Sequence, residues 1–431
     1  MPKWYESPRW SGELTDCALP MMFDQYSSCG YDCLYCFSFF QRARNEGRNA
    51  YLKGDYRPVN VEAVKRIFTD PDSSRFGPYV KRRFPLQWGG LSDPFCPHER
   101  ERGVGLELLR FFRELRYPVS FSTKGEWFTK DDRYREVFAG ADHFHVKVSI
   151  ITLEREKATA IERACPSPGH RLRNIERLRD LRIGGVTLRL RPFILGVSDQ
   201  TCEELIGEAA KRGAASVSTE FLCMEHSSRL APKWTAISRY CGFDLETFYR
   251  SQSRYTGYYR LNRNVKRPYI DRLQEACAAH GLRFYVSDSH FKERSAGGCC
   301  CGIPDSWEHS TCQWADGLLR ARTEGTITFS EVYRGCDWFS RPFNQAGIND
   351  RCSPEKQAAT RNMTVLDWLR FHWNNVNSGK SPYKYFGGVL RLDGRDENGD
   401  VIYRYVGDSA DLHSEPRPGE DGNYTACAAG C

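Results

Sequence analysis

The stretch SCGYDCLYCF at residues 28–37 places three cysteines, Cys29, Cys33 and Cys36, at C-x3-C-x2-C spacing. Three thiolates on one tight loop can each bind one iron of a cubane 4Fe-4S cluster, which leaves the fourth iron without a protein ligand. Such an iron is open to a ligand from solution. The motif therefore predicts a site for a metal-bound cofactor, with the rest of the chain as its scaffold.

An aromatic residue, Tyr35, stands directly before the last cysteine, and with it the motif resembles the signature of the radical S-adenosylmethionine (radical SAM) enzymes. The resemblance implies that Cys29, Cys33 and Cys36 hold the cluster and that Tyr35 lies near the adenine of S-adenosylmethionine. In that family the open iron binds this cofactor, and one electron cleaves it to a 5'-deoxyadenosyl radical. A reductant such as flavodoxin or ferredoxin is the implied electron donor.

Structural zinc is the alternative for these cysteines, and it would make the chain a zinc-binding interaction protein without catalysis. Zinc of this kind takes four ligands, usually from two C-x2–4-C pairs. No second pair follows the motif at the spacing of a zinc knuckle. The pattern therefore favours an iron–sulfur cluster.

The composition is that of a globular protein with metal or redox chemistry. The 431 residues are 40% hydrophobic and 27% charged, and the formal net charge of +7 permits a nucleic-acid partner without requiring one. No apolar run approaches the ~20 residues of a membrane span, and the first residues lack a signal pattern. We expect a cytoplasmic location, where eighteen cysteines indicate metal or redox chemistry before disulfides. Single cysteines in helices, such as Cys165, Cys202 and Cys277, are expected to be small core residues.

Strand and helix patterns alternate along the first two thirds of the chain. Strands are expected at 21–23, 84–88, 118–122, 144–151, 186–195, 215–222 and 282–287, and helices at 41–44, 60–69, 106–116, 129–138, 153–164, 171–181, 204–212 and 268–279. Such alternation predicts parallel βα units and the α/β class. Together with the resemblance, it predicts an incomplete parallel (β/α) barrel of the radical SAM type.

Gly89 and Gly90 follow the expected strand at 84–88, and glycines there let the backbone approach a ligand closely. A Gly-Gly pair alone is weak evidence, because turns use it routinely. The fuller pattern GGLSDPFCPHE at 89–99 resembles an element of the branch that includes spore photoproduct lyase and its DNA-photolyase-like relatives. The resemblance implies that the two glycines contact the methionyl amino group, and it makes Asp93 and Glu99 polar candidates.

Parallel barrels carry their chemistry at the carboxyl ends of the strands, and this rule selects Ser149, Arg191, Gly196 and Glu220. The resemblance implies that Ser149 contacts the ribose of the cofactor and that Arg191 and Gly196 belong to a fifth-strand element beside the adenine. Lys124 also follows a strand, but a lysine in a loop is expected to be solvated.

The segment ERACPS at 162–167, followed by Arg171, resembles a Glu-x-x-x-Pro-Ser and Arg pair of the photolyase-like branch. A salt bridge between helices or on the surface explains Glu162 and Arg171 equally well. Both interpretations stay open.

The alternation breaks between residues 223 and 265, where aromatic and basic residues mingle. They are Trp234, Tyr240, Phe243, Phe248, Tyr249, Tyr255, Tyr258 and Tyr259 with Arg229, Lys233, Arg239, Arg250, Arg254, Arg260 and Arg263. Aromatics mixed with arginines can stack bases and hold phosphates. The same composition suits a helical lid whose tyrosines pack on the barrel. The lid is favoured, and nucleic-acid contact stays open.

Cys299, Cys300 and Cys301 form a second cysteine group in a glycine-rich loop, and we take them as the candidate catalytic residues. Adjacent cysteines cannot all bind one metal ion comfortably. One or two of them can hold an auxiliary iron–sulfur cluster or zinc together with later cysteines, namely Cys312, Cys336 and Cys352. Alternatively, one thiol donates a hydrogen atom to a substrate radical, since its S–H bond is weak.

Four regions are expected: an N-terminal arm at 1–16, the barrel at 17–295 with the insertion at 223–265, a cysteine-bearing α+β extension at 296–407, and a flexible tail at 408–431. The extension is expected to contain helices at 313–322 and 365–375, a strand at 326–333, and a hairpin at 389–406 that turns at Asn398-Gly399.

These features favour a radical SAM enzyme of the lyase or oxidoreductase type that abstracts hydrogen from a nucleic-acid base or nucleotide, in repair or modification. The first alternative is a peptide or small-molecule substrate with an auxiliary cluster. The second is the zinc-binding interaction protein. No oligomeric state is predicted.

Overall fold

Eight strands form one curved sheet in the computed structural model, which describes residues 4–38, 56–225, 231–256, 258–340 and 363–408. The strand order is β1-β2-β3-β4-β5-β6-β7-β10. Every neighbouring pair from β2 to β10 is parallel, and only β1 runs antiparallel to its neighbour. The bounds are β1 Arg9–Trp10, β2 Met21–Phe23, β3 Leu86–Trp88, β4 Val119–Thr123, β5 Phe144–Ser149, β6 Gly185–Phe193, β7 Ser216–Phe221 and β10 Arg283–Val286.

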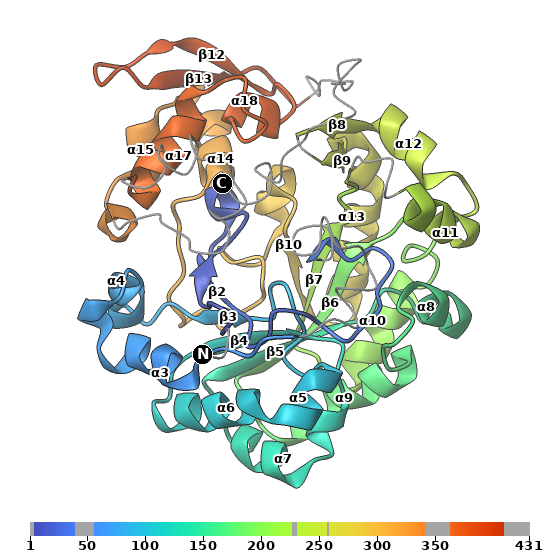
Figure 1. Cartoon of the computed structure of the whole chain (residues 1–431). Coiled ribbons are helices and arrows are strands. Elements are labelled where there is room, and N and C mark those ends of the chain that lie inside the picture. The colour runs from blue at the N-terminus through green and yellow to red at the C-terminus, as the bar shows by residue number, and fades with distance from the viewer. Residues whose placement is uncertain (1–3, 39–55, 226–230, 257, 341–362, 409–431) are drawn as a thin grey trace.

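Helices connect these strands and lie along the outer face of the sheet (Figure 1). They are α3 Val61–Thr69, α4 Gly77–Lys81, α5 Pro97–Arg102, α6 Val104–Glu114, α7 Asp132–Phe138, α8 Arg155–Ile161, α9 Pro168–Asp180, α10 Cys202–Lys211 and α13 Arg263–Ala279. The expected α/β class and the incomplete parallel barrel are confirmed, because the observed strands match the expected ones within a few residues. The short strand β1 was not expected.

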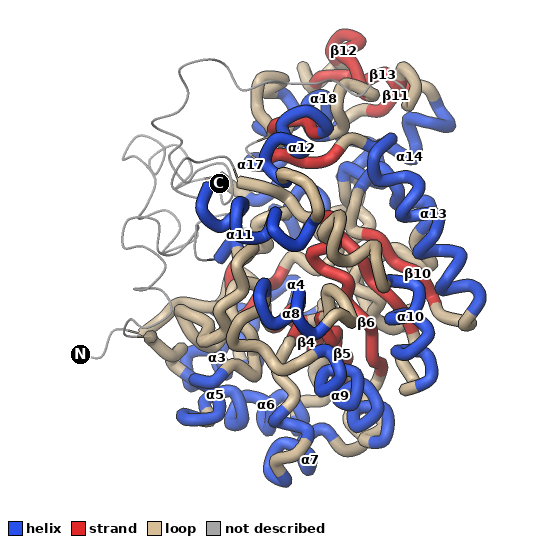
Figure 2. The backbone as a smooth tube through the Cα atoms, turned by 90° about the vertical axis from the view of Figure 1, so that its right-hand side faces the viewer, coloured by secondary structure: helices blue, strands red, loops and turns tan. Residues whose placement is uncertain are grey.

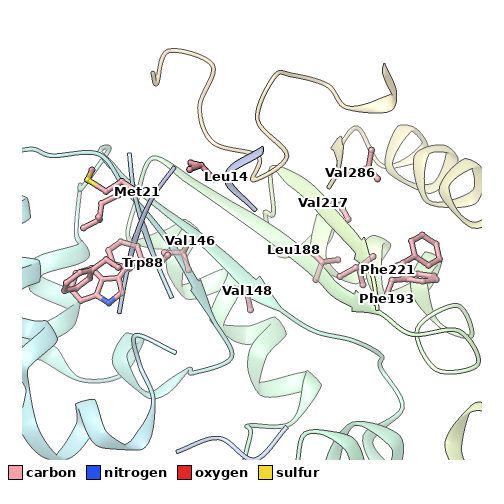
Figure 3. Close-up of a cluster of buried hydrophobic side chains, with 14 of the residues drawn as sticks. Leu14, Met21, Trp88, Val146, Val148, Leu188, Phe193, Val217, Phe221 and Val286 are labelled. Carbon is pink, nitrogen blue, oxygen red and sulfur yellow. The ribbon is translucent and has the colours of Figure 1, made fainter. Parts of the chain in front are cut away.

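Alternation along the strands separates an apolar outer face from a polar interior. Val146, Val148, Leu188 and Val217 are fully buried in the hydrophobic core and come from three neighbouring strands (Figure 3). Successive side chains of a strand point to opposite faces, so the residues between them face the inside of the barrel. The interior is therefore polar where the outer face is apolar.

A chain of hydrogen bonds crosses four strands inside the barrel. His145 on β5 contacts Ser120 Oγ on β4 at 3.0 Å and Thr187 Oγ1 on β6 at 2.8 Å, and Thr187 contacts Ser216 Oγ on β7 at 2.7 Å. Burial, assisted by the nearby Lys147, lowers the pKa of His145 to about 3. The imidazole is therefore neutral at physiological pH.

The loop that carries the three adjacent cysteines enters the barrel. A Cβ on Gly302 would lie 2.9 Å from Ser216 Oγ and 3.0 Å from Thr187 Oγ1, so the loop packs directly on the interior side of β6 and β7. Cys299, Cys301 and Ile303 pack with Ala18 and Leu19 in a separate small hydrophobic cluster. This cluster joins the segment between β1 and β2 to the segment after β10, the two edges of the sheet.

The aromatic and basic insertion forms two helices and a hairpin: α11 Ala231–Cys241, α12 Leu245–Gln252, β8 Ser253–Tyr255 and β9 Tyr259–Leu261. Its aromatic side chains at 234–259 are buried or half-buried wherever the structure describes them. Trp234 donates its indole N–H to the Glu225 carbonyl at 3.3 Å, and Tyr249 donates to the Leu222 carbonyl at 2.8 Å. The aromatic residues thus pack this unit onto the barrel.

The C-terminal extension contains α14 Trp314–Glu324, α15 Phe329–Tyr333, α17 Val365–Asn374, α18 Pro382–Tyr385 and the antiparallel strands β11 Thr326–Ile327, β12 Leu390–Arg395 and β13 Val401–Tyr405. Figures 1 and 2 both place its strands at the end of the molecule opposite α6 and α7. The strand expected at 326–333 is wrong beyond Ile327. Thr328 and Glu331 form a capping box, and a helix follows.

Within the described ranges, no helix has both the length and the apolar character of a membrane span. The helix expected at 41–44, Arg229, Cys352 and the tail from residue 409 lie outside the described residues. The domain boundaries stay predictions.

Candidate active site

The loop of the three-cysteine motif follows β2 at the carboxyl edge of the sheet and is tied to the connection between α8 and α9. Leu34 donates its backbone N–H to the Ile161 carbonyl at 2.8 Å, and Arg163 donates to the Asp32 carbonyl at 3.2 Å. Cys33 forms an isolated antiparallel bridge with Glu162. Backbone contacts therefore fix the motif beside Glu162, 129 residues later in the sequence.

The thiols of the motif lie beside two cysteines that the sequence did not connect with it. Cys33 Sγ is 3.7 Å from Cys165 Sγ, and Cys29 is hydrogen-bonded to Cys96. Cys165, expected to be a core residue, is thus a neighbour of the site. Its hydrogen bond, helped by Lys124, lowers the pKa of Cys33 against the opposing effect of burial.

The three motif cysteines fit an iron–sulfur cluster by their chemistry. They provide three sulfur donors within eight residues of one loop, the number that a 4Fe-4S cluster with one open iron takes from the protein. In the described part of the chain no three Cys, His, Asp or Glu side chains are grouped as ligands of one metal ion. Instead, Cys29 and Cys33 face the two neighbouring cysteines.

A buried ion pair lies next to the motif. Arg171 and Glu162 are 2.6 Å apart, with side chains 1% and 0% exposed. Tyr35 donates its hydroxyl to Glu162, and Arg171 donates to the Ser149 carbonyl at 2.8 Å. The salt bridge between helices that the sequence left open is present, and it also links the motif to the end of β5.

Lys124 belongs to this network, so the expectation of a solvated loop lysine is wrong. Its side chain is 17% exposed, its Nζ lies 4.0 Å from Glu162 Oε1, and it lies 5.6 Å from the centre of the Tyr35 ring. Burial works to lower the pKa of Lys124, but Cys33 and Glu162 together raise it above its ordinary value. The lysine therefore keeps its positive charge beside the cysteine motif.

Asp93 connects the Gly-Gly loop to the end of β4. Its carboxylate accepts hydrogen bonds from Thr123 Oγ1 at 2.7 Å, from the Lys124 N–H at 2.6 Å and from the Phe95 N–H at 2.9 Å. Burial raises the pKa of Asp93, and these donors oppose the rise. Asp93 thus holds the backbone of Lys124 in place.

Glu99, the second acidic candidate, caps a helix. It accepts hydrogen bonds from the backbone N–H groups of Gly105 at 2.7 Å and Leu106 at 2.9 Å, in the first turn of α6. The hydroxyls of Tyr26 and Tyr134 donate to it at 2.9 and 2.5 Å. Gln25 Nε2 donates to it as well, at 3.4 Å. Five donors thus occupy the carboxylate, which explains its place in the sequence without a ligand.

Packing and backbone conformation require a glycine at Gly89, whereas a Cβ on Gly90 would meet only the ends of flexible side chains. Gly89 has φ +102°, and a Cβ there would lie 2.5 Å from the Ser122 carbonyl oxygen. A Cβ on Gly90 would lie 2.2 Å from Met22 Cε. Contact of these glycines with a cofactor stays a prediction.

Arg191 and Gly196 lie farther along the mouth of the barrel, past the centre of β6. Arg191 forms an ion pair with Glu220 at the end of β7. Gly196 has φ +79°, and a Cβ there would lie 2.1 Å from the Cys241 carbonyl oxygen of α11. Hydrogen bonds join Tyr35 and Ser149 through Glu162 and Arg171, whereas Arg191 and Gly196 occupy a second part of the mouth.

The Cys301 thiol contacts the thiols of Cys299 and Cys300 inside the barrel, near Lys147 of β5 and Arg189 of β6. Hydrogen bonds with Cys299 and Cys300 lower the pKa of Cys301, whereas burial raises it. The positive charges of Lys147 and Arg189 also lower this pKa. Cys300 is also hydrogen-bonded to Ser287.

The second cysteine group expected from the sequence is divided in the structure. Cys312 and Cys336 form a disulfide with each other, between the segment before α14 and the turn after α15. Cys17 packs against the cluster that contains Cys299 and Cys301. An auxiliary site built from Cys312 or Cys336 is therefore not the arrangement that the structure shows.

Comparison with known proteins gives matches only among solved structures, since no family model and no curated protein matches the chain. A spore photoproduct lyase mutant has a TM-score of 0.48 at 15% identity, over 66% of this chain and 80% of that chain. Streptococcus suis SuiB bound to the precursor peptide SuiA has a TM-score of 0.44 at 13% identity, over 85% and 75%. The radical S-adenosylmethionine methyltransferase TsrM from Kitasatospora setae has 0.33 at 10%, over 49% and 37%.

This chain resembles radical SAM enzymes in structure. All three TM-scores are below 0.5, so the function proposed for the chain rests on its own residues.

Proposed function

We propose that the protein is a radical SAM enzyme in which Cys29, Cys33 and Cys36 bind a 4Fe-4S cluster. The observation that carries the proposal is the position of the C-x3-C-x2-C loop, directly after β2 at the carboxyl edge of a parallel sheet. Parallel barrels do their chemistry at this edge. When bound, a reduced cluster supplies the electron that cleaves S-adenosylmethionine, whose 5'-deoxyadenosyl fragment then takes a hydrogen atom from the substrate.

The chain's own residues hold the site in shape. Tyr35 and Arg171 both bond to the buried Glu162, and Arg171 also holds the Ser149 carbonyl. The cysteine loop and the end of β5 are therefore fixed relative to each other by groups from which water is excluded. Lys124 adds a positive charge beside the motif.

Residues that contact S-adenosylmethionine are proposed around this network: Tyr35, Gly89, Gly90, Asp93, Ser149, Arg191 and Gly196. Tyr35 is linked to Ser149 by contacts that run through Glu162 and Arg171. Asp93 accepts a hydrogen bond from the backbone N–H of Lys124. These two connections support a shared site. Arg191 and Gly196 follow at the same edge of the sheet, on β6 and the turn after it.

We propose a small molecule or a peptide as the substrate in place of nucleic acid, and the packing of the insertion supports this choice. The nucleic-acid hypothesis depends on aromatic side chains that can stack on bases. The described aromatics of the insertion, from Trp234 to Tyr259, pack inward, and none is fully exposed. Salt-dependent binding of DNA or RNA with micromolar affinity would restore the nucleic-acid hypothesis.

The test of the enzyme class is anaerobic reconstitution with iron and sulfide, followed by reduction with dithionite in the presence of S-adenosylmethionine. We expect 5'-deoxyadenosine from the wild-type chain and none from the Cys29/Cys33/Cys36 triple alanine variant. Cys277→Ala is the matched control, because this cysteine is buried in α13. Product from the triple variant, or bound zinc in place of iron, would remove the proposal.

Cys299, Cys300 and Cys301 are proposed as catalytic residues that act through a thiol. The contacts of the Cys301 thiol with those of Cys299 and Cys300 inside the barrel support this role. Measuring the iron content distinguishes this thiol role from an auxiliary cluster held by the same cysteines, because one cluster gives about four irons per chain and two clusters give about eight. We expect about four.

A further inference from the structure

A fourth cysteine lies beside the motif and has no role in the function proposed above. Cys165 is half-buried in the turn between α8 and α9. It forms no disulfide, and a hydrogen bond of 3.7 Å joins its sulfur to that of Cys33. A free thiol thus contacts one of the three proposed iron ligands, although 132 residues separate the two in the sequence.

Backbone hydrogen bonds hold Cys165 next to Cys33 without help from either thiol. Two of them, of 2.8 and 3.2 Å, join the backbone of residues 32–34 to that of residues 161–163. The Cys165 N–H then donates to the Glu162 carbonyl at 3.0 Å, which closes the turn that carries the thiol. None of these bonds uses a sulfur atom, so binding of iron to Cys33 Sγ breaks none of them.

The direction of the hydrogen bond between the two sulfurs follows from the chemistry of an iron ligand. Iron binds the thiolate form of a cysteine, so a Cys33 that binds iron has no proton to donate. Cys165 stands outside the motif, and an ordinary thiol with a pKa of about 8.5 keeps its proton at neutral pH. The Cys165 S–H is then the donor, and the Cys33 sulfur is the acceptor.

A donor to a ligand sulfur changes how easily an iron–sulfur cluster is reduced. Reduction adds one electron, which makes the ligand sulfurs more negative. A hydrogen bond to such a sulfur therefore stabilises the reduced cluster more than the oxidised one, and hydrogen bonds to the sulfurs are among the factors that set the reduction potential. Removal of the donor should lower this potential.

We propose that Cys165 donates its S–H to the Cys33 sulfur and thereby raises the reduction potential of the cluster. It is a positioning residue, because it acts through Cys33 and binds neither iron nor substrate. The inference rests on the proposed function, since the cluster concerned is the one that Cys29, Cys33 and Cys36 are proposed to bind. It adds a residue that governs how readily this cluster accepts its electron.

The test is electron paramagnetic resonance of the reconstituted full-length chain, held anaerobically at the midpoint potential of the wild type. It measures the ratio of reduced to oxidised cluster. We expect this ratio to fall about threefold or more in Cys165→Ala, which corresponds to about 28 mV for a one-electron couple. Cys165→Ser keeps a donor at this position and should restore most of the ratio. Cys277→Ala, a buried cysteine of α13, is the matched control and should leave it unchanged.

The sign of the shift separates hydrogen bonding from packing. Water that entered the space left by alanine would stabilise the more negative, reduced cluster, so the ratio would rise in C165A and the inference would be overturned. An unchanged ratio in C165A, or a serine variant that behaves like the alanine variant, overturns it as well. Iron content well below about four per chain in C165A alone would make Cys165 a ligand, which also contradicts the proposed role.

The wild-type chain tests the proposed function separately on the same preparations. A wild-type chain that binds no cluster removes the proposed function and this inference together. A wild-type cluster that is reduced and cleaves S-adenosylmethionine, with a ratio that Cys165→Ala leaves unchanged, overturns only the role of Cys165. A lowered ratio in C165A that serine restores supports this role even if 5'-deoxyadenosine is not formed.

Discussion

The ion pair of Glu162 and Arg171 links the cysteine motif to the end of β5. Both side chains are almost completely buried, and each also bonds to a neighbouring segment. Removing two charges from water costs several kcal/mol per ion, which only good geometry and further hydrogen bonds offset. The pair is therefore best understood as a device that fixes the position of the loop, and its loss should disturb both stability and site.

Replacing Arg171 by methionine leaves the buried Glu162 with only the more distant Lys124 ammonium, 4.0 Å away, as a cation. We expect this change to lower the free energy of unfolding by about 3–5 kcal/mol, measured by urea denaturation of the metal-free chain. The double variant E162Q/R171M should lose less, because it removes both charges of the buried pair. Arg135→Met, which breaks an exposed pair with Asp132, should cost below about 1 kcal/mol. A cost for R171M no larger than that of R135M would contradict this account.

The sequence predicted some of these residues and missed others for a physical reason. Glu162 and Arg171 were selected because a motif of adjacent residues carries them. Cys165 and Lys124 were missed, since burial and contact with Cys33 arise only when segments up to 132 residues apart meet. A thiol or an amine shows no such signal in its own neighbourhood.

Helix termini show how individual elements are fixed in this protein. The first N–H groups of a helix have no partner within the helix. Asn60 accepts from the Ala63 N–H at the start of α3, whereas α6 uses the Glu99 side chain from the preceding helix. The capping box of α15 is visible in the sequence at Thr328 and Glu331. It indicates a helix start, which the apolar pattern at 326–333 obscured.

Glu99→Ala tests whether the Ser-Asp-Pro element ends in a helix cap or in a cofactor ligand. The change leaves two N–H groups and two tyrosine hydroxyls without their acceptor, so we expect at least about 2 kcal/mol of destabilisation. Glu107→Ala, an exposed residue of the same helix that bonds to Lys65, should cost less than about 1 kcal/mol. S-adenosylmethionine cleavage per folded molecule should be unchanged in E99A. A selective loss of cleavage in a fully stable E99A would show that the carboxylate belongs to the cofactor site.

Gly196 and Gly242 offer a matched pair for the junction between the barrel and the insertion. Both have positive φ, +79° and +80°, but only a Cβ on Gly196 would collide with a backbone oxygen, that of Cys241. Gly242→Ala should therefore cost only the conformational strain, about 1 kcal/mol. Gly196→Ala should cost clearly more, about 2–4 kcal/mol, in urea unfolding. Equal costs for the two variants would mean that α11 moves away freely.

At the scale of the whole molecule, the N-terminal segment joins the barrel to the C-terminal extension. Asp16 accepts from the Ala315 N–H of α14 at 2.9 Å and from the Tyr385 hydroxyl at 3.2 Å, and Ser289 after β10 also donates to it. The parallel barrel could be predicted from the sequence, because each of its strands has a local pattern. This junction could not, since its partners come from positions near 16, 289, 315 and 385 that share no motif.

The charge of Asp16 makes the stability of this junction depend on pH. Burial raises the pKa of Asp16 to about 7 against the opposing effect of Lys292, from an ordinary value of 3.8. Between these two values the folded chain holds a proton that the unfolded chain has released, so the contribution of Asp16 is fully present below about pH 4 and is lost as the pH rises to about 7. We expect the difference in unfolding free energy between Asp16→Asn and the wild type to shift in favour of the variant from pH 4.5 to pH 8. The control is Asp305→Asn. Asp305 is exposed, and its ion pair with Arg283 lowers the pKa of its carboxyl group. It is therefore ionised throughout this pH range, and the variant should show no such shift in urea titrations. Parallel stability curves for D16N and the wild type would show that Asp16 stays ionised in the folded chain, and the extension would then be held by its apolar contacts and backbone hydrogen bonds alone.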